Sequence, residues 1–545
     1  MISNARYRPR RFAWKTALCI ASLFLLSVAR FIYLQADFPI DLGDPGMAYT
    51  DEGWWSRNAI AWVREGNWYI DDGYNPITYL PILSVFQVLW FKLFGASLGA
   101  ARAISVLCSL LVSVLVYDLA RQEIRPQIAW IAPFIVLSSY PVFAYSRLAI
   151  LEMPMILLIL ASLWLAVTPF KRQLPAANQN TLHTTSLFKI VGSGVLFAIA
   201  IFTKTTALFA LPVVALLLLL RSGFTWRSVR THLKSALLWL LIVGITVGIF
   251  HLLLQQFGDV QSQTHFSNYN VTQKVPSSPS SAWKGPFRVV ERSARLFPLM
   301  FIGLLGAITL FIKEKIYYSS QLFRTVTLWS AATLSAFSLS NFAALRYFLV
   351  LIVPIALVVP LTLQYAFTEK SLTEKAFTKP AFTQQATSTG KTVLSKRNQT
   401  PLSFKNLTPP CVALLLIFTL STGYSLARIA NYLSTPHFTL VETADTIEHY
   451  IEQDNLASNV VMGHFADTVA LTAQQIKAVN DKFGFRSLEY RIKTFNPAYY
   501  LSIGEIEPER QQVIESDYQI DLIKTFDLYQ NRDYDKPVFL YRLTR

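Results

Sequence analysis

About twelve long apolar runs, separated by short polar connections, occupy the first 430 residues of the chain. Most of them approach the roughly 20 apolar residues that an α-helix needs to cross a bilayer. We therefore predict an all-α, polytopic membrane domain over residues 16–365 and a last transmembrane helix at 409–430. The apolar runs are 16–35, 77–94, 100–120, 127–144, 148–167, 187–203, 205–221, 235–256, 297–313, 322–340, 345–367 and 409–430.

The pattern of apolar positions changes after residue 430. Val441–Ile451 has the periodicity of an amphipathic helix, whereas Val460–Met462 and Pro537–Arg542 are typical of short strands. We therefore predict a small soluble α/β domain at 431–545. Before the last apolar run, residues 366–408 repeat Ala-Phe-Thr three times among polar residues, which predicts a disordered cytoplasmic linker.

Composition supports the membrane assignment. Hydrophobic residues make up 53% of the 545 residues and charged residues only 15%, compared with about 25% charged residues in ordinary soluble domains. A plain cytosolic enzyme is therefore excluded. Cys19, Cys108 and Cys411 all lie inside apolar runs, where a thiol behaves as a small hydrophobic group, so we expect no disulfide and no cysteine-bound metal.

The formal charge of +16 is unevenly distributed, and its distribution argues against a nucleic-acid partner. Residues 431–545 carry eleven basic and seventeen acidic side chains, so the positive excess lies in the first 430 residues. Much of it falls in the basic N-terminus, 1–15, and in connections between apolar runs, as is typical of cytoplasmic loops. We interpret the first apolar run as a retained helix and not as a signal peptide, because it is long and lacks an evident cleavage site.

The charge pattern also predicts the topology. Loop 36–76 contains eight acidic and two basic residues, so we place it on the outer side, whereas the basic connection 121–125 is cytoplasmic. An odd number of crossings must separate them, yet the two apolar runs 77–94 and 100–120 lie between. We predict that 77–94 is re-entrant or interfacial, because it is short and carries Lys92. The chain then has about 11 transmembrane helices, and its C-terminal domain is extracytoplasmic.

This topology gathers polar positions from distant segments at the outer face, which predicts a functional site there. Asp51 and Glu52 form an acidic pair in the first outer loop, followed directly by Trp54 and Trp55. Tryptophans are enriched at the membrane interface, where a carboxylate can be partly desolvated and act as a base. A solvated acidic loop at a helix start is the alternative interpretation of the same pair.

Basic residues at predicted outer helix ends are the second component of this site. Lys204 is the strongest candidate because it interrupts an apolar stretch, and Arg346 lies in a similar turn; Arg102 and Arg147 complete the set. Charged side chains in a membrane segment are seldom idle, although snorkelling to the interface is the alternative for each of them. Glu152, inside an apolar run, is expected to pair internally with a basic neighbour.

The order of short motifs along residues 15–360 resembles the GT-C superfamily of integral-membrane glycosyltransferases, the group that contains the protein O-mannosyltransferases and the aminoarabinose transferases of lipid A. The motifs are Thr50-Asp51-Glu52-Gly53-Trp54-Trp55, Tyr74-Asn75-Pro76, Phe91-Lys92-Leu93-Phe94-Gly95, Ala101-Arg102, Tyr145-Ser146-Arg147-Leu148, Phe202-Thr203-Lys204 and Arg346-Tyr347.

The resemblance implies a general base at Asp51, with Glu52 beside it as a second candidate catalytic residue. Independently of the resemblance, their charge predicts that the basic residues bind the donor phosphate. One motif departs from the aminoarabinose transferases, which have Glu-Lys-Pro where this chain has Tyr74-Asn75-Pro76. The metal-binding acid and the phosphate-binding lysine of that subgroup are therefore absent at this position. We predict no metal ligand set; a divalent metal lacks support from the sequence, although His265 is a weak candidate ligand.

The implied reaction moves a sugar from a polyprenyl-phosphate donor to an acceptor hydroxyl or amine, the acceptor being an unidentified glycan, lipid or protein. A departing phosphate needs no proton, so one base and several cations suffice, and a single displacement inverts the anomeric carbon. An outer-face site with such a donor implies a plasma (inner) membrane. Aromatic residues near the acidic pair are candidates for stacking on the sugar or contacting lipid: Trp54, Trp55, Tyr74, Tyr79 and Tyr347.

Two other functions remain compatible with the sequence. A transporter or flippase of lipid-linked sugars would share the membrane helices, but no internal repeat of helices is evident and the polar positions gather at one face. A polymerase or ligase of surface polysaccharide would use an oligosaccharide donor. The oligosaccharyltransferase branch is disfavoured, because Trp54-Trp55 lacks the following Asp of its signature.

Overall fold

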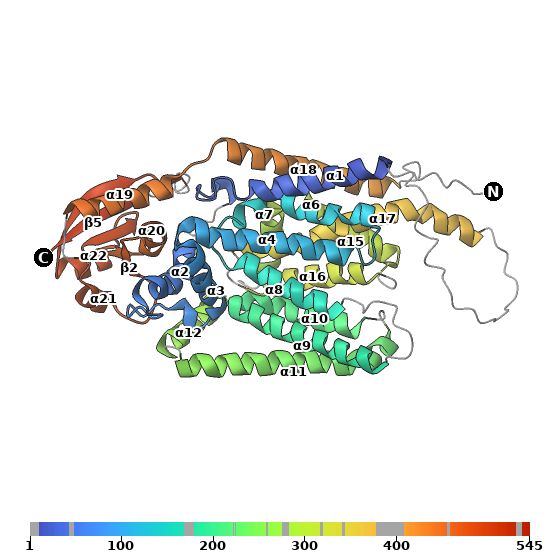
Figure 1. Cartoon of the computed structure of the whole chain (residues 1–545), viewed down its shortest axis with the longest axis horizontal. Helices are drawn as coiled ribbons and strands as arrows, with labels where there is room; N and C mark the ends of the chain where they lie inside the picture. The colour runs from blue at the N-terminus through green and yellow to red at the C-terminus, as the bar shows by residue number, and fades with distance from the viewer. Residues whose placement is uncertain are drawn as a thin grey trace, which may run out of the picture.

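The computed structural model is elongated, with a bundle of helices that carries the C-terminal domain at one end (Figure 1). The structure describes the whole chain except residues 1–9, 43–47, 168–178, 222, 224, 258–259, 275–282, 317–319, 341–343, 378–407, 455–457 and 530–536.

The apolar runs form the helices of the bundle, as their periodicity and length predict. Their bounds are α1 (Arg10–Ala29), α4 (Leu98–Ala120), α5 (Pro126–Ala129), α6 (Ile131–Ser138), α8 (Glu152–Val167), α9 (Gln179–Thr203), α10 (Leu211–Leu219), α11 (Trp226–Phe257), α15 (Met300–Lys313), α16 (Gln321–Ser338), α17 (Ile352–Phe377) and α18 (Pro409–Ser434). The prediction of a multi-pass, mainly α-helical membrane protein is confirmed.

Within the described residues, four helices are long and apolar enough to cross a membrane, and a bent pair of helices would make a fifth. The four spans are Leu98–Ala120, Trp226–Gln256, Leu345–Phe367 and Pro409–Asp454. Other apolar helices are shorter than this criterion, so the number of eleven crossings stays a prediction.

Many of the apolar runs break close to one end of the bundle. A 3₁₀ segment, η4 (Thr205–Ala210), separates α9 from α10, and η6 (Leu345–Leu351) precedes α17. The run predicted at 127–144 divides into α5, α6 and α7 (Tyr140–Tyr145), with Pro141 in the first turn of α7. Each break leaves backbone groups without their helical partners, so polar side chains must satisfy them where water is excluded.

The outer-loop segment contains an 18-residue helix, α2 (Ala48–Glu65), between the short turns η1 (Ile40–Leu42) and η2 (Pro76–Thr78). Helix α3 (Pro81–Phe94) packs on α2, and both lie at the end of the bundle next to the C-terminal domain (Figure 1). Helix α3 is shorter than a membrane span, and the prediction that residues 77–94 do not span the membrane stays a prediction. The described part of the long connection 257–296 includes the helices α12 (Val260–Lys274) and α14 (Gly285–Leu296).

The C-terminal domain contains a mixed five-stranded sheet with strand order β2-β1-β3-β5-β4. Strand β1 pairs in parallel with β2 and β3, whereas β5 runs antiparallel to β3 and β4. The predicted helix and two strands are present as α19, β1 and β5; the other elements were not predicted. The bounds are α19 (Thr439–Asp454), β1 (Val460–Gly463), α20 (Ala466–Thr472), β2 (Lys477–Val479), α21 (Leu488–Phe495), β3 (Tyr499–Ile503), α22 (Pro508–Glu515), β4 (Gln519–Phe526) and β5 (Val538–Thr544).

The predicted linker begins later than expected. Helix α17 continues to Phe377, so the first part of segment 366–408 is helical. Residues 378–407, where most of the linker prediction falls, lie outside the described residues.

Helix α2 docks directly on the C-terminal domain. The backbone N–H of Gly53 donates to Thr468 Oγ1 at 3.2 Å, and α20 packs along α2. Farther along α2, the Arg64 guanidinium donates to the carbonyls of Ala470, at 2.9 Å, and Ile476, at 3.3 Å. The helix that bears the predicted acidic pair is therefore anchored to a domain more than 400 residues away in sequence.

We predict that Gly53→Ala loosens this docking. A Cβ added at Gly53 would lie 2.2 Å from the backbone nitrogen of Thr468, and backbone cannot move aside as a flexible side chain can. Overpacking of this kind costs about 1–3 kcal/mol. The midpoint of thermal unfolding of the full-length protein in detergent is therefore expected to fall.

Gly244→Ala in α11 is the matched control, since no described atom outside its own stretch of helix lies within 4 Å of the added Cβ. We expect its midpoint to stay close to that of the unchanged protein. Equal midpoints for the two variants would show that α2 and α20 are not in the close contact described here.

Candidate active site

Four charged side chains from distant parts of the chain meet beside the first turn of α2. Asp51 comes from α2 and Glu152 from the first turn of α8. Lys204 lies between α9 and η4, and Arg346 lies in η6. We call these four residues the charge cluster.

Ion pairs connect all four members of the charge cluster. Arg346 Nη2 lies 2.6 Å from Asp51 Oδ2, and Arg346 Nε lies 3.0 Å from Glu152 Oε1. Lys204 Nζ pairs with the same oxygen of Glu152. Two carboxylates thus balance two cations, and the expectation that Glu152 pairs internally with a basic neighbour is confirmed.

Tyr347 lies against both cations of the charge cluster. Lys204 Nζ is 4.4 Å from the centre of its ring, and the Arg346 guanidinium carbon is 5.6 Å from it. An aromatic face attracts cations, so this ring helps to hold them at the cluster. The ring therefore contacts the cations in this structure, and its predicted sugar or lipid contact stays a prediction.

Burial sets the acid–base character of Asp51. Its removal from water raises the pKa of the carboxyl group, and the positive charge of Arg346 opposes that rise. Desolvation favours the neutral form of an acid, whereas a nearby cation favours the charged form. Loss of the Arg346 charge would thus raise the proton affinity of Asp51.

Breaks in the helices explain why charged residues occupy these positions. Lys204 has an extended backbone, with φ of −158° and ψ of 125°, and lies between the end of α9 and η4. Arg346 belongs to the 3₁₀ turn before α17. At such a break the side chain can lie at the end of the bundle. It can therefore form an ion pair there, even though the residues next to it in sequence are apolar.

The structure places Glu52 apart from Asp51, against Arg102. Arg102 Nε and Nη2 each lie 2.7 Å from a different carboxylate oxygen of Glu52, which forms a buried bidentate pair. Arg102 Nη1 donates to the carbonyls of Leu34 and Ala36. Each side chain thus satisfies the other's charge in this structure, and the predicted catalytic role of Glu52 and phosphate-binding role of Arg102 stay predictions.

Arg147 also lies outside the charge cluster. Its guanidinium donates to the carbonyls of Arg30, at 2.9 Å, and Ile32, at 2.6 Å, just after α1 ends. It also packs over the rings of Phe143 and Tyr432. Arg147 thus satisfies carbonyls just beyond the end of α1 in this structure, and its predicted phosphate-binding role stays a prediction.

The aromatic residues of the first outer segment mostly contact protein. Trp54 packs edge-on against Phe483, with ring centres 4.6 Å apart, and against His464. Tyr74 covers the Arg57 guanidinium at 5.2 Å. Both rings therefore contact protein in this structure, and their predicted sugar or lipid contact stays a prediction.

Trp55 and Tyr79 also pack within the protein. Trp55 is partly buried against the apolar core, and the ring of Tyr79 stacks on Phe266 with centres 3.4 Å apart.

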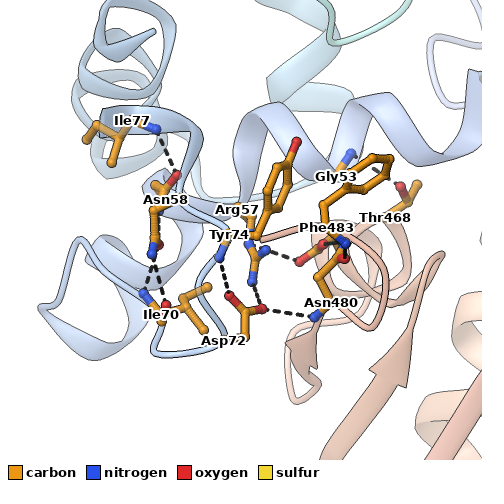
Figure 2. A network of polar contacts seen from close by, with 12 residues as sticks. Gly53, Arg57, Asn58, Ile70, Asp72, Tyr74, Ile77, Thr468, Asn480 and Phe483 are labelled. Atoms are coloured by element: carbon orange, nitrogen blue, oxygen red, sulfur yellow. Dashed lines mark hydrogen bonds and ion pairs between the residues drawn. The ribbon is translucent and has the colours of Figure 1, made fainter. Parts of the chain in front are cut away.

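A second buried network links α2 to the C-terminal domain, and the sequence did not reveal it. Figure 2 shows Arg57 between Asp72, with which it forms a hydrogen-bonded ion pair, and the C-terminal domain. Arg57 Nε lies 3.4 Å from Asp467 Oδ1, and the backbone N–H of Asn480 donates to Asp72 Oδ2 at 2.9 Å. Asp72 thus accepts hydrogen bonds both from α2, through Arg57, and from the C-terminal domain, through Asn480.

Asn58, one residue after Arg57, holds the rest of the first outer segment. Its side-chain amide donates to Asn75 Oδ1 at 2.9 Å. Its amide oxygen accepts the N–H of Ile77 at 3.2 Å (Figure 2). The helical spacing of Gly53, Arg57 and Arg64 on α2 is the sequence signal for a polar docking face, but its partner residues cannot be recognised from sequence.

The described residues contain no group of three or more His, Cys, Asp or Glu side chains that could hold a metal ion. His265, the weak candidate ligand, is exposed on α12.

Comparison with known proteins finds a matching family model and solved structures with a similar fold. The family model for dolichyl-phosphate-mannose-protein mannosyltransferase matches residues 76–250. The crystal structure of ArnT from Cupriavidus metallidurans bound to undecaprenyl phosphate is similar, with a TM-score of 0.59 and 14% sequence identity, over 97% of this chain and 98% of ArnT. A comparison with curated proteins finds no match.

The archaeal oligosaccharyltransferase AglB from Archaeoglobus fulgidus, in complex with an inhibitory peptide and a dolichol-phosphate, has a TM-score of 0.50 and 12% identity, over 93% of this chain and 73% of AglB. At these identities the likeness establishes architecture, and the family-model match adds a sequence relationship over the central part of the membrane domain. The chain therefore has the fold of the GT-C membrane glycosyltransferases, as the ordered motifs predicted.

Proposed function

We propose that this protein is a membrane glycosyltransferase that moves a sugar from a polyprenyl-phosphate donor to an acceptor hydroxyl or amine. The charge cluster is the observation that carries the proposal, since it joins one candidate base, Asp51, to two cations, Lys204 and Arg346. The reaction takes place at the outer face of the plasma membrane, on the side that bears the C-terminal domain.

The chemistry of the donor explains why these groups suffice. The bond that breaks joins the anomeric carbon to a phosphate oxygen, and the phosphate leaves with the bonding electrons and without a proton. The acceptor oxygen or nitrogen forms the new bond and loses a proton to Asp51. One displacement inverts the anomeric carbon, whereas a glycosidase uses two carboxyl groups at the scissile bond.

The cations stabilise the negative charge that grows on the leaving phosphate. Fixed charges aimed at a developing charge contribute strongly to catalysis where water is excluded. Arg346 offers a planar group suited to two phosphate oxygens, and Lys204 offers a compact ammonium. Glu152 touches both cations and, in this mechanism, holds them in place.

The Arg346–Asp51 pair couples donor binding to the activation of the base. An arriving phosphate competes with Asp51 for the Arg346 guanidinium. Both groups are anions, so the phosphate can take the place of the carboxylate beside the guanidinium. As Arg346 turns to the phosphate, Asp51 loses the cation that holds down its pKa. The carboxylate becomes a stronger base only when a donor is present, which limits unproductive proton transfer.

We predict that Asp51→Asn lowers the rate of sugar transfer about 10²–10⁴-fold, the usual contribution of a general base. The amide keeps the size of the side chain but cannot accept a proton. Transfer of radiolabelled sugar from a polyprenyl-phosphate donor in reconstituted membranes measures the effect.

Glu65→Gln is the matched control for this experiment, because Glu65 is an exposed acid on the same helix, α2. Its carboxylate pairs with Lys477 at 2.9 Å, outside the charge cluster. Its transfer rate should stay near that of the unchanged protein. An unaltered rate in Asp51→Asn would reject Asp51 as the base. Label that crosses the bilayer still attached to its lipid would instead favour a transporter.

Arg346→Gln is predicted to shift the pH dependence of kcat/KM. Without the Arg346 charge, the pKa of Asp51 rises further, so a higher pH is needed to keep the base deprotonated. The acid limb of the pH–rate profile should therefore move to higher pH, and the KM for the donor should increase.

Arg428→Gln removes one guanidinium from a half-exposed pair with Asp41, away from the charge cluster. This variant should change neither the acid limb nor the KM for the donor. An Arg346→Gln profile with an unmoved acid limb would contradict the electrostatic coupling between Arg346 and Asp51.

A further inference from the structure

Helix α14 turns sharply into the helix that follows it. The angle between α14 and α15 is 114°, and Leu299 at the corner has a left-handed backbone with φ of 60°. α15 is apolar from Met300 to Ile312, as befits a membrane helix. If α15 runs across the bilayer, α14 runs along its surface.

The sequence of α14 divides into three faces at helical spacing. Gly285, Val289 and Leu296 are buried against the bundle. Phe287 and Val290 are exposed by 78% and 54%, and Trp283, two residues before α14 begins, continues their stripe and is exposed by 79%. Such an exposed apolar stripe is unusual in water but typical of a helix that lies in a membrane interface.

The third face of α14 is charged. It contains Arg288, Glu291 and Arg295, and Lys284 at the N-cap extends it, again at spacings of four, three and four residues; Arg292 lies at its border. Four cations against one acid give this helix an excess of three positive charges. Lys284 and Arg295 are exposed. These charges keep α14 out of the hydrocarbon core and place it at the level of the lipid headgroups.

Close backbone contact fixes α14 to the end of the bundle that bears the charge cluster. A Cβ at Gly285 would lie 1.9 Å from the carbonyl oxygen of Ser338, at the end of α16. The Arg288 guanidinium donates to the carbonyl of Ser340, and α14 packs on η6, the turn that contains Arg346. The helix therefore lies in the leaflet on the side of the candidate site.

We propose that α14 is an interfacial helix that binds the anionic headgroups of bilayer phospholipids. Its apolar stripe inserts among the upper acyl chains, and its basic face contacts phosphate groups beside it. Each Lys or Arg near an anionic membrane surface contributes about 1 kcal/mol, or roughly a fivefold preference. This inference concerns lipid binding and does not depend on the reaction proposed above.

The depth of α14 can be measured with a spin label at position 287 in the full-length protein. Phe287→Cys is introduced after the native cysteines are replaced by Ala, at Cys19, Cys108 and Cys411. In vesicles of phosphatidylcholine with phosphatidylglycerol, the label should be relaxed more by oxygen than by a water-soluble nickel chelate. Stronger relaxation by the nickel chelate would place α14 in water and overturn the proposal.

The charge preference is tested by Lys284→Gln combined with Arg295→Gln. Association of spin-labelled phosphatidylglycerol, relative to spin-labelled phosphatidylcholine, should fall severalfold in this double variant. Lys493→Gln with Lys524→Gln removes the same charge from exposed positions of the C-terminal domain and should leave the preference unchanged.

Equal preferences in the two double variants would reject α14 as the anionic-lipid surface. Displacement of the labelled phosphatidylglycerol by much smaller amounts of a polyprenyl phosphate would also overturn the proposal, since it would assign the basic face to the sugar carrier. Both readouts are independent of activity, so an inactive preparation does not affect them.

Discussion

The need to satisfy charges and backbone groups away from water governs this structure. Wherever an apolar helix ends inside the protein, its last carbonyls lose their helical partners. Arg30 is fully buried and donates to the carbonyls of Val136, Leu137 and Val142, close to where α6 gives way to α7. Arg147 does the same beyond α1. A helix break thus needs a basic side chain to bind its free carbonyls, and the buried basic side chain needs those carbonyls as acceptors. This requirement concentrates charge at one end of the bundle.

Buried arginines at this end differ in how easily they can exchange partners. Arg102 is tied to Glu52, which is fully buried, and removal of one partner from such a pair leaves an unpaired charge at a cost of about 3–5 kcal/mol. Arg346 faces two carboxylates in a cluster of balanced charge. A phosphate can replace Asp51 there without leaving the guanidinium unpaired, so the geometry separates a structural arginine from one suited to ligand exchange.

The sequence predicted elements and charge positions better than pairings. Helical runs were recognised because their apolar length is a local property, and Lys204 and Arg346 stood out because they interrupt such runs. Arg102 and Arg147 have the same local signature, yet their partners are Glu52 and carbonyls beyond α1. Only the tertiary fold decides that outcome. The docking of Trp54 on Phe483 was likewise hidden, since 429 residues separate them.

Helix α2 is held from two directions, and this makes the C-terminal domain part of the candidate site. Asp51 pairs with Arg346 of the bundle, while Arg57, less than two turns later, lies between Asp72 and Asp467. At 1.5 Å per residue the two positions are about 9 Å apart along one rigid helix. A rotation of α2 that separates Arg57 from Asp467 must also move Asp51 relative to Arg346. The docked domain thus restrains the position of the proposed base, although its own side chains lie outside the charge cluster.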